Sequence, residues 1–343
     1  MRAAVLRQTG DENLEIRDDV EVVGPGAGEV KVRIAATGVC HSDLSGMTGV
    51  IPQPAPAVLG HEGAGIIAEV GEGVTTVKEG DHVIVAWSPP CGICTSCVAN
   101  KSPHLCSAIQ INAIMTPRFR LDGEPIFGFA GTGTFAEEIV LPQQAVVPID
   151  PTVPLEIASL IGCGGVGISA IQGARIAGAA EIVAVDLLES KLDDAKRLGA
   201  THGTTPDGLA SLSQEITEGV GFDYAFEAIG NPVTMRAAYD AVRRGGTATI
   251  IGVGKADAMV SFSAFELFYS EKRLVGSYYG SADVRSDFHR LLRLWRAGKL
   301  DLEGMISRKI DIGEINDAFA TMRRGEMIRQ VVQFENVREV VQS

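Results

Sequence analysis

The pattern of hydrophobic and polar positions changes its character near residue 150. Before that point, short β-type apolar runs occupy residues 29–35, 65–70 and 82–86. Turns rich in glycine and proline, such as Gly24-Pro25-Gly26, separate these runs. Short runs broken by such turns predict an irregular β domain.

Beyond Asp150-Pro151, helical and strand patterns alternate. The predicted helices cover residues 166–177, 190–198 and 233–242, and the predicted strands cover residues 181–186, 223–228 and 247–253. This rhythm is typical of an α/β fold with a parallel, doubly wound sheet. The tail adds a predicted amphipathic helix over residues 288–296 and a strand over residues 330–334. With 343 residues, two domains are expected.

Composition narrows the choice of partners. The net charge of −13 argues against nucleic acid and against an anionic membrane surface as binding partners. No apolar run reaches transmembrane length, and the apolar run at the N-terminus is too short for a signal peptide. We therefore expect a cytoplasmic protein.

Four of the six cysteines lie within sixteen residues, namely Cys91, Cys94, Cys97 and Cys106. Their spacing lets four thiolates converge on one tetrahedral zinc, which leaves no open position for a substrate. The segment therefore predicts a structural zinc site. A redox or disulfide cluster is the alternative, and a cytoplasmic location disfavours it.

A second candidate zinc site combines Cys40, His61 and Cys163. Cys40 precedes His41-Ser42-Asp43, and His61 precedes Glu62. One histidine and two cysteines leave the fourth position of a zinc ion free for water or substrate, which is the pattern of a catalytic site. Without Cys40 and the four clustered cysteines, His61 would be interpreted as an ordinary histidine and not as a metal ligand.

The glycines Gly162, Gly164 and Gly167 form a Gly-x-Gly-x-x-Gly pattern that opens a predicted helix. Such a turn brings the backbone close to a pyrophosphate at the helix N-terminus. Asp186 ends the next predicted strand and can accept hydrogen bonds from ribose hydroxyls. Two leucines follow it, so no arginine is available for a 2′-phosphate. The segment therefore favours NAD over NADP, and an accidental glycine-rich turn is the alternative.

Together these residues resemble the zinc-dependent medium-chain alcohol dehydrogenases over nearly the whole chain. The resemblance implies a Rossmann-type cofactor domain at residues 155–278. It also implies a discontinuous, mainly-β GroES-like catalytic domain at residues 1–154 and 279–343. By the same resemblance we expect NAD, two zinc ions per chain, a small alcohol or aldehyde as substrate, and a homodimer or homotetramer.

The resemblance also assigns roles to single residues. Ser42 begins a proton relay, and Asp43 and Glu62 occupy positions of acids that orient metal ligands. The predicted cofactor contacts are His41, Gly162, Gly164, Gly165, Gly167, Asp186, Lys191 and Arg329. Trp87 and Phe129 match positions that line the substrate pocket, with plain core aromatics as the alternative. Solvated surface charges are the alternative for Lys191 and Arg329.

The chain departs from the family pattern at two places. Ser45 stands where many members have a histidine at the end of the relay. In addition, the family has a zinc-ligand segment and a separate phosphate turn, with a linking helix and a strand between them, whereas here the single Gly162-Cys163-Gly164 stands in the place of both. By typical lengths of helices and strands, roughly 25 residues are missing. Only residues 157–161 are available as the first strand of the cofactor sheet. If Cys163 binds zinc instead, the sheet loses that strand.

The implied activity is oxidation of a primary alcohol to an aldehyde, or the reverse, by hydride transfer to NAD. Two related activities stay open, a thiol-adduct formaldehyde dehydrogenase and a polyol dehydrogenase. A catalytically silent zinc protein is the third alternative. Because of the shared Gly-Cys-Gly, we expect the chain as written to be a poor alcohol dehydrogenase.

Overall fold

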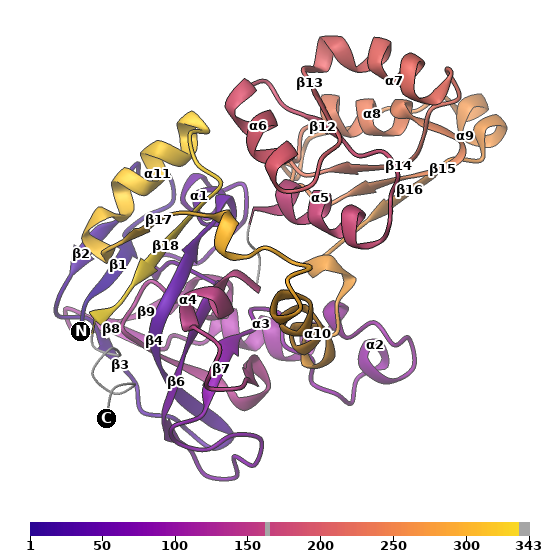
Figure 1. Cartoon of the computed structure of the whole chain (residues 1–343). Coiled ribbons are helices and arrows are strands. Elements are labelled where there is room, and N and C mark those ends of the chain that lie inside the picture. Colours follow the sequence, from indigo (N-terminus) through magenta and orange to yellow (C-terminus); the bar gives the residue numbers. More distant parts are fainter. Residues whose placement is uncertain (162–164, 336–343) are drawn as a thin grey trace. The chain divides into compact units, whose positions relative to one another are not determined.

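The computed structural model describes residues 1–161 and 165–335. The chain divides into two units (Figure 1). The first unit contains Met1–Gly164 and Ser281–Ser343, and the second contains Gly165–Gly280. Gly162, Cys163 and Gly164 lie outside the described residues. The domain boundaries and roles inferred from the sequence stay predictions.

The described residues of the first unit form two β-sheets. One has six strands in the order β2-β1-β5-β9-β8-β3, formed by Glu15–Arg17, Ala3–Leu6, Ala57–Val58, Glu124–Gly128, Phe119–Leu121 and Glu21–Val22. The other has the order β11-β7-β6-β4-β18-β17, formed by Val146–Pro148, His82–Val85, Gly63–Val70, Glu29–Val39, Arg329–Gln333 and Ile306–Ile310. Strand β10 (Glu138–Pro142) also pairs with β4.

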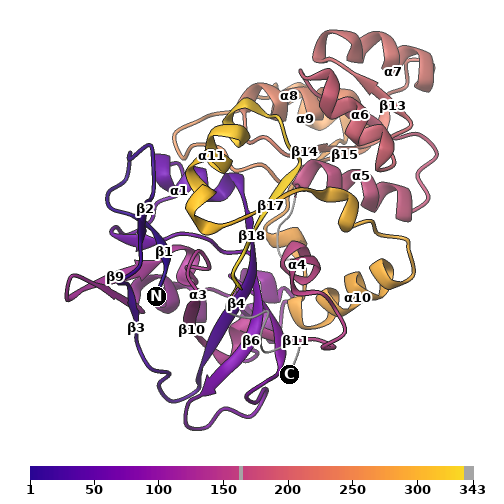
Figure 2. The ribbon, with the colours of Figure 1, turned by 60° about the vertical axis from the view of Figure 1, so that its left-hand side comes forward.

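Strand β4 is the centre of the second of these sheets. Along its first half, buried Val30, Val32 and Ile34 alternate with half-buried polar residues, as the period of a strand requires. The C-terminal strand β18 lies beside it and runs antiparallel, with Gln330 opposite Val39 (Figure 2). This pairing brings the start of β18, with Arg329, to the position where β4 leads into Cys40.

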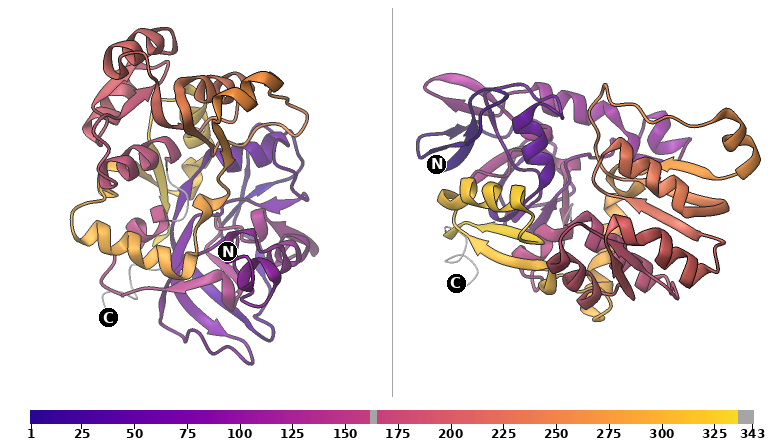
Figure 3. Two further views of the ribbon diagram at one scale, coloured as in Figure 1. Left: turned by 90° about the vertical axis from the view of Figure 1, so that its right-hand side faces the viewer. Right: turned by 90° about the horizontal axis from the view of Figure 1, so that it is seen from above.

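The helices of the first unit are α1 (His41–Thr48), α2 (Thr95–Val98), α3 (Ser107–Met115), α4 (Leu155–Ala158), α10 (Val284–Arg296) and α11 (Ile315–Arg324). The amphipathic pattern of α10 is confirmed, since Val284, Phe288 and Leu292 are buried at a spacing of four. The C-terminal segment lies beside the N-terminal one (Figure 3), and Asn316 exchanges two hydrogen bonds with the backbone of Leu14. No single helix among the described residues is both long and apolar enough to span a membrane.

The second unit alternates helices with parallel strands. Its strands are β12 (Val183–Val185), β13 (His202–Thr204), β14 (Phe222–Glu227), β15 (Val242–Ile250) and β16 (Arg273–Gly276). Its helices are α5 (Val166–Ile176), α6 (Glu189–Arg197), α7 (Leu209–Thr217), α8 (Pro232–Ala241) and α9 (Ala264–Ser270). All strand pairs of this unit are parallel, which confirms the predicted α/β class.

Residues 157–161 form no strand. They belong to α4 and to a following 3₁₀ turn, Ser159–Ile161. Ile157, Leu160 and Ile161 are buried, and α4 packs on β4 and β6 of the first unit. The alternative in which this segment is the first strand of the cofactor sheet is therefore wrong.

Candidate metal centres and cofactor segment

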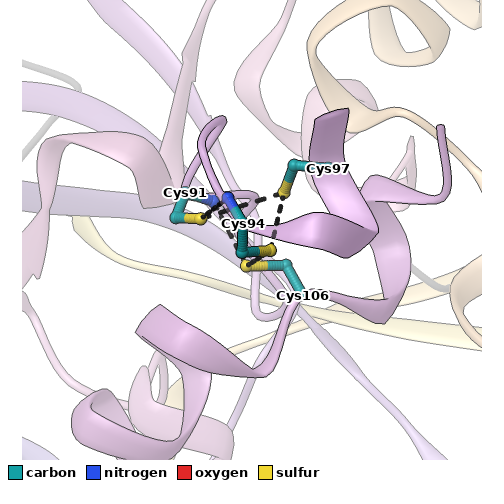
Figure 4. A group of neighbouring side chains, drawn as sticks. All are labelled: Cys91, Cys94, Cys97 and Cys106. Carbon is teal, nitrogen blue, oxygen red and sulfur yellow. Dashed lines mark hydrogen bonds between the residues drawn. The ribbon is translucent and has the colours of Figure 1, made fainter. Parts of the chain in front are cut away.

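The sulfur atoms of the four clustered cysteines converge on one point (Figure 4). The Sγ atoms of Cys94 lie 3.6 Å from Cys97 and 3.8 Å from Cys106, and those of Cys91 and Cys97 are 3.9 Å apart. A disulfide needs an S–S distance of about 2.05 Å. Four sulfurs at about 2.3 Å from a tetrahedral zinc are about 3.8 Å from one another. The cluster fits zinc and not a disulfide.

Backbone donors prepare one of these thiols for metal binding. The N–H groups of Ile93 and Cys94 donate to Cys91 Sγ at 3.4 and 3.3 Å, and they lower the pKa of Cys91 to about 6. Burial raises the pKa of the Cys97 thiol to about 12. Zinc binding at the cluster must therefore displace protons from some of its thiols.

A second group of donor atoms lies where β4 ends and before β6 begins. Cys40 caps the start of α1, while His61 and Glu62 follow Gly60, whose φ of +90° favours glycine. The ligand atoms of Cys40, His61 and Glu62 lie within 4.8 Å of one another, and all three residues are buried. Sulfur, imidazole and carboxylate are all zinc ligands, so these residues fit a zinc site.

Asp43 holds this group in place through three contacts. Its Oδ1 lies 3.0 Å from His61 Nδ1 and accepts the N–H of Gly60 at 3.0 Å. Its Oδ2 accepts the N–H of Cys40 at 3.1 Å. With Nδ1 bonded to the carboxylate, Nε2 is the ring nitrogen of His61 that could bind a metal. Nε2 lies 3.8 Å from Glu62 Oε1.

The environment also favours the ionised form of Cys40. Burial raises the pKa of its thiol, but the hydrogen bond and charge of His61 and the charge of Arg329 outweigh burial and bring this pKa to about 6. A thiolate is the form that binds zinc. Ser42 lies next to it, with Oγ 3.7 Å from Cys40 Sγ.

Arg329 of β18 is buried against Glu62, and the two side chains form an ion pair. The guanidinium also donates to the carbonyl of Val39 at 3.0 Å. A Cβ on Gly38 would overlap Glu62 Oε2 and would lie 2.8 Å from Arg329 Nη2, so glycine leaves the space for this pair. The contact of Arg329 with pyrophosphate stays a prediction.

Two aromatic side chains surround His61. The ring of Phe129 is edge-on at a centroid distance of 5.4 Å, and that of Trp87 is edge-on at 6.4 Å. Both rings therefore lie beside His61, one of the candidate zinc ligands, which is where residues that line a substrate pocket are expected. Their contact with a substrate stays a prediction.

In the second unit, the predicted cofactor segment is described from Gly165 onward. Gly165 caps α5, and Gly167 lies in the first turn of this helix. Asp186 follows β12; its Oδ1 accepts the N–H of Leu188 at 3.0 Å, and its Oδ2 lies 4.0 Å from Lys191 Nζ. Asp186 and Lys191 are therefore neighbours, and their contacts with a cofactor stay predictions. His41 is exposed on α1, and its cofactor role stays a prediction.

Sequence reasoning missed Glu227, a buried acid at the carboxyl end of β14. Its Oε1 accepts the N–H groups of Ile229 and Gly230 and the hydroxyl of Thr234, at 2.7 to 2.9 Å. Ligands of parallel α/β sheets bind at this end of the strands. An acid at the end of a predicted strand was the signal that could have identified it.

Comparisons with known proteins agree with this architecture. A family model described as "Alcohol dehydrogenase GroES-like domain" matches residues 26–151, and one described as "Zinc-binding dehydrogenase" matches residues 165–296. A crystal structure titled as an alcohol dehydrogenase zinc-binding domain protein from Burkholderia ambifaria superposes with a TM-score of 0.90 at 30% identity. The superposition covers 97% of this chain and 98% of the chain in that crystal structure.

Two curated relatives are similar over almost their whole length. An alcohol dehydrogenase class-3 from Cereibacter sphaeroides is 38% identical, covering 97% of this chain and 99% of the relative. An S-(hydroxymethyl)glutathione dehydrogenase from Paracoccus denitrificans is 37% identical, covering 96% and 99%. The first alignment spans 377 positions, of which this chain fills about 333, so about 44 positions have no residue here.

Proposed function

The chain belongs to the zinc-dependent medium-chain alcohol dehydrogenase family, and from this membership we propose that it oxidises a primary alcohol to an aldehyde, or catalyses the reverse, with NAD. The observation that carries the proposal is the buried group of Cys40, His61 and Glu62, ordered by Asp43. A buried set of metal donors beside aromatic side chains suits chemistry on a small substrate, whereas the four-cysteine cluster suits a structural role.

Cys40 and His61 would hold the catalytic zinc. Cys163, the third predicted ligand, lies outside the described residues. Zinc supplies a Lewis acid that lowers the pKa of an alcohol and polarises a carbonyl. NAD supplies the hydride acceptor.

The chain's own residues would position the reactants and move the proton. The Ser42 hydroxyl, next to Cys40, would take the proton that the alcohol loses. Phe129 and Trp87 would exclude water on the side of His61. Asp43 would hold the proton of His61 on Nδ1 and orient the ring so that Nε2 faces the metal site. Ser45 in place of a histidine implies that the last proton step uses water or another group.

Oxidation of a thiol adduct of formaldehyde is the second candidate, because the Paracoccus relative is named for that substrate. A substrate profile separates the two. We expect the highest kcat/KM with primary alcohols; the highest value with S-(hydroxymethyl)glutathione would favour the second candidate. The highest value with polyols would overturn both. Cys40→Ser should abolish every activity, and Ser96→Ala, a conservative change in the four-cysteine lobe, should abolish none.

A homodimer is the proposed assembly, with a homotetramer as the alternative. Strand β16 pairs only with β15 among the described residues and exposes Leu274 and Val275 on an open sheet edge. An open, apolar edge favours pairing with a second copy, and a lysine on it disfavours pairing. We expect light scattering to give at least two chains per particle, and Val275→Lys to lower that number. A monomeric unmodified chain would contradict the proposal.

A cytoplasmic location is proposed as well. The support is chemical, since the described cysteines are all free thiols, a state that a reducing compartment preserves.

A further inference from the structure

The parallel strands of the second unit form two separate sheets. Strand β12 pairs with β13, while β14, β15 and β16 form a three-stranded sheet. No pairing joins β12 to β14 among the described residues. A doubly wound fold of six strands has the spatial order 3-2-1-4-5-6.

The five strands of this unit match all positions of that order except one. β13 and β12 take positions 3 and 2, and β14, β15 and β16 take positions 4, 5 and 6. Position 1, between β12 and β14, has no strand in the described part of the chain. β12 is parallel to β13, and β14 is parallel to β15. In a doubly wound sheet, a strand at position 1 runs parallel to the strands on both sides of it.

Nothing described upstream of α5 can fill this position. Residues 155–161 are helical and buried in the first unit, and α5 begins at Val166. The relative from Cereibacter has about 44 aligned positions that this chain lacks. A strand with its connection fits within that number.

The strands beside position 1 expose apolar side chains. Val185 of β12 is 41% exposed, and Tyr224 and Phe226 of β14 are 66% and 51% exposed. Strands of a parallel sheet covered on both faces are normally buried and apolar. Tyr224 and Phe226 are two residues apart and therefore point to the same face of β14.

The buried core of the unit is divided in the same way. One cluster contains Ala184 of β12, Leu192 and Ala195 of α6, and the flanking residues Ile182 and Ala200, and three residues of α5 pack against it, namely Ile168, Ile171 and Ala174. Another joins α8 to β15 through Tyr239, Val242 and Ala248. A central strand with apolar side chains on both faces would connect the two clusters.

We propose that β12 and β14 flank an open strand position, and that this position binds an extended apolar peptide segment as a parallel central strand. The occupant is a partner of four to six uncharged, β-branched residues, because β14 offers six residues for pairing and both faces of the new strand would be buried. Backbone hydrogen bonds on both sides would provide affinity, as in other cases of strand addition.

The test uses the full chain and a fluorescein-labelled peptide of five valine and isoleucine residues between lysine pairs. We expect saturable binding by fluorescence anisotropy. A peptide with proline at its centre should bind at least tenfold more weakly, because proline lacks the N–H that pairing needs. The assay contains no alcohol and no NAD, so its outcome is independent of the proposed function.

Two variants locate the peptide. Phe226→Lys should weaken binding at least tenfold, because it puts a charge beside the open position. The matched control Phe265→Lys, on α9, alters a side chain that is 69% exposed and should leave affinity unchanged. The proposal would be overturned if the proline peptide bound as tightly as the peptide without proline. It would also be overturned if Phe226→Lys and Phe265→Lys lowered the peptide affinity equally. Self-association that Phe226→Lys abolishes, with no peptide binding, would overturn it too, since the occupant would then be a second copy.

Discussion

Asp43 shows how a single side chain orders the candidate catalytic centre. Its carboxylate accepts hydrogen bonds from the backbone N–H groups of Cys40 and Gly60 and contacts the ring of His61. Asp43 therefore joins two segments, since Cys40 and Gly60 are twenty positions apart. Spacing in the sequence was sufficient to select Cys40 and His61. It was not sufficient to pair Glu62 with Arg329, because that contact depends on the antiparallel register of β18 with β4.

Replacing Asp43 tests the ordering of the metal ligands. We expect Asp43→Asn to weaken zinc at the Cys40–His61 site by roughly 10–100-fold, since it removes the charge that orients the ligand histidine. The measurement is zinc retained per chain during competition with a chelator. Asp81→Asn is the matched control, because Asp81 caps the backbone of Lys78 in a surface turn. Unchanged zinc retention in Asp43→Asn would contradict the role given to Asp43.

Asp186 tests the choice of cofactor. We expect NADH to bind the unmodified chain more tightly than NADPH, because the carboxylate repels a 2′-phosphate. Two unit charges near 4 Å repel by about 1–4 kcal/mol at a protein surface, so Asp186→Ser should narrow the preference roughly tenfold. Titrations with NADH and NADPH measure the ratio of the two affinities. Asp193→Ser, on the exposed side of α6, is the control and should leave this ratio unchanged. Equal affinities for the two cofactors in the unmodified chain would refute the assignment.

At the scale of elements, regular apolar periodicity identified most of the fold. The predicted strands at residues 29–35 and 223–228 and the predicted helix at residues 233–242 correspond to β4, β14 and α8. The short strands β13 and β17 were missed, because neither His202–Thr204 nor Ile306–Ile310 has a clear alternation of apolar and polar residues. Helix α11 was missed although Ile315, Ala318 and Phe319 form a buried stripe.

The lobe that carries the four cysteines has little core of its own. Neither α2 nor the 3₁₀ turn Pro103–Leu105 has a buried residue. Local structure without apolar burial requires another source of stability, and a bound metal supplies one. The sequence identified this lobe because its ligands lie in one short segment.

Removing one ligand should therefore unfold the lobe locally. We expect Cys94→Ser to lower the zinc content by one per chain and to make residues 91–106 sensitive to limited proteolysis. Metal analysis and the cleavage pattern measure the two effects. Cys40→Ser is the control, since it should lose the other zinc and leave the lobe resistant. Full zinc content in Cys94→Ser would rule out the structural zinc.

At the scale of the whole molecule, the sequence indicated where the fold is incomplete. The sequence predicts a conflict there, because one Gly-Cys-Gly would have to end the segment that carries the third zinc ligand and also follow a strand into the phosphate turn. The structure agrees for the described residues, because residues 155–161 are helical in the first unit. Sequence reasoning could not decide this point, since Ile157, Leu160 and Ile161 suit a buried strand as well as a buried helical turn.

Restoring the missing elements should raise activity. The chain as written should be a poor alcohol dehydrogenase, because dinucleotides bind at the carboxyl end of the strands of such sheets and the described residues contain no central strand. A variant with a linking helix, an apolar strand and a second glycine motif inserted after residue 164 should bind NADH at least tenfold more tightly and gain kcat/KM for primary alcohols. An insertion of equal length made of glycine and serine is the control and should gain neither. If the unmodified chain, with two zinc ions, turns over primary alcohols as fast as the restored one, the central strand is dispensable and Cys163 completes the zinc site without it.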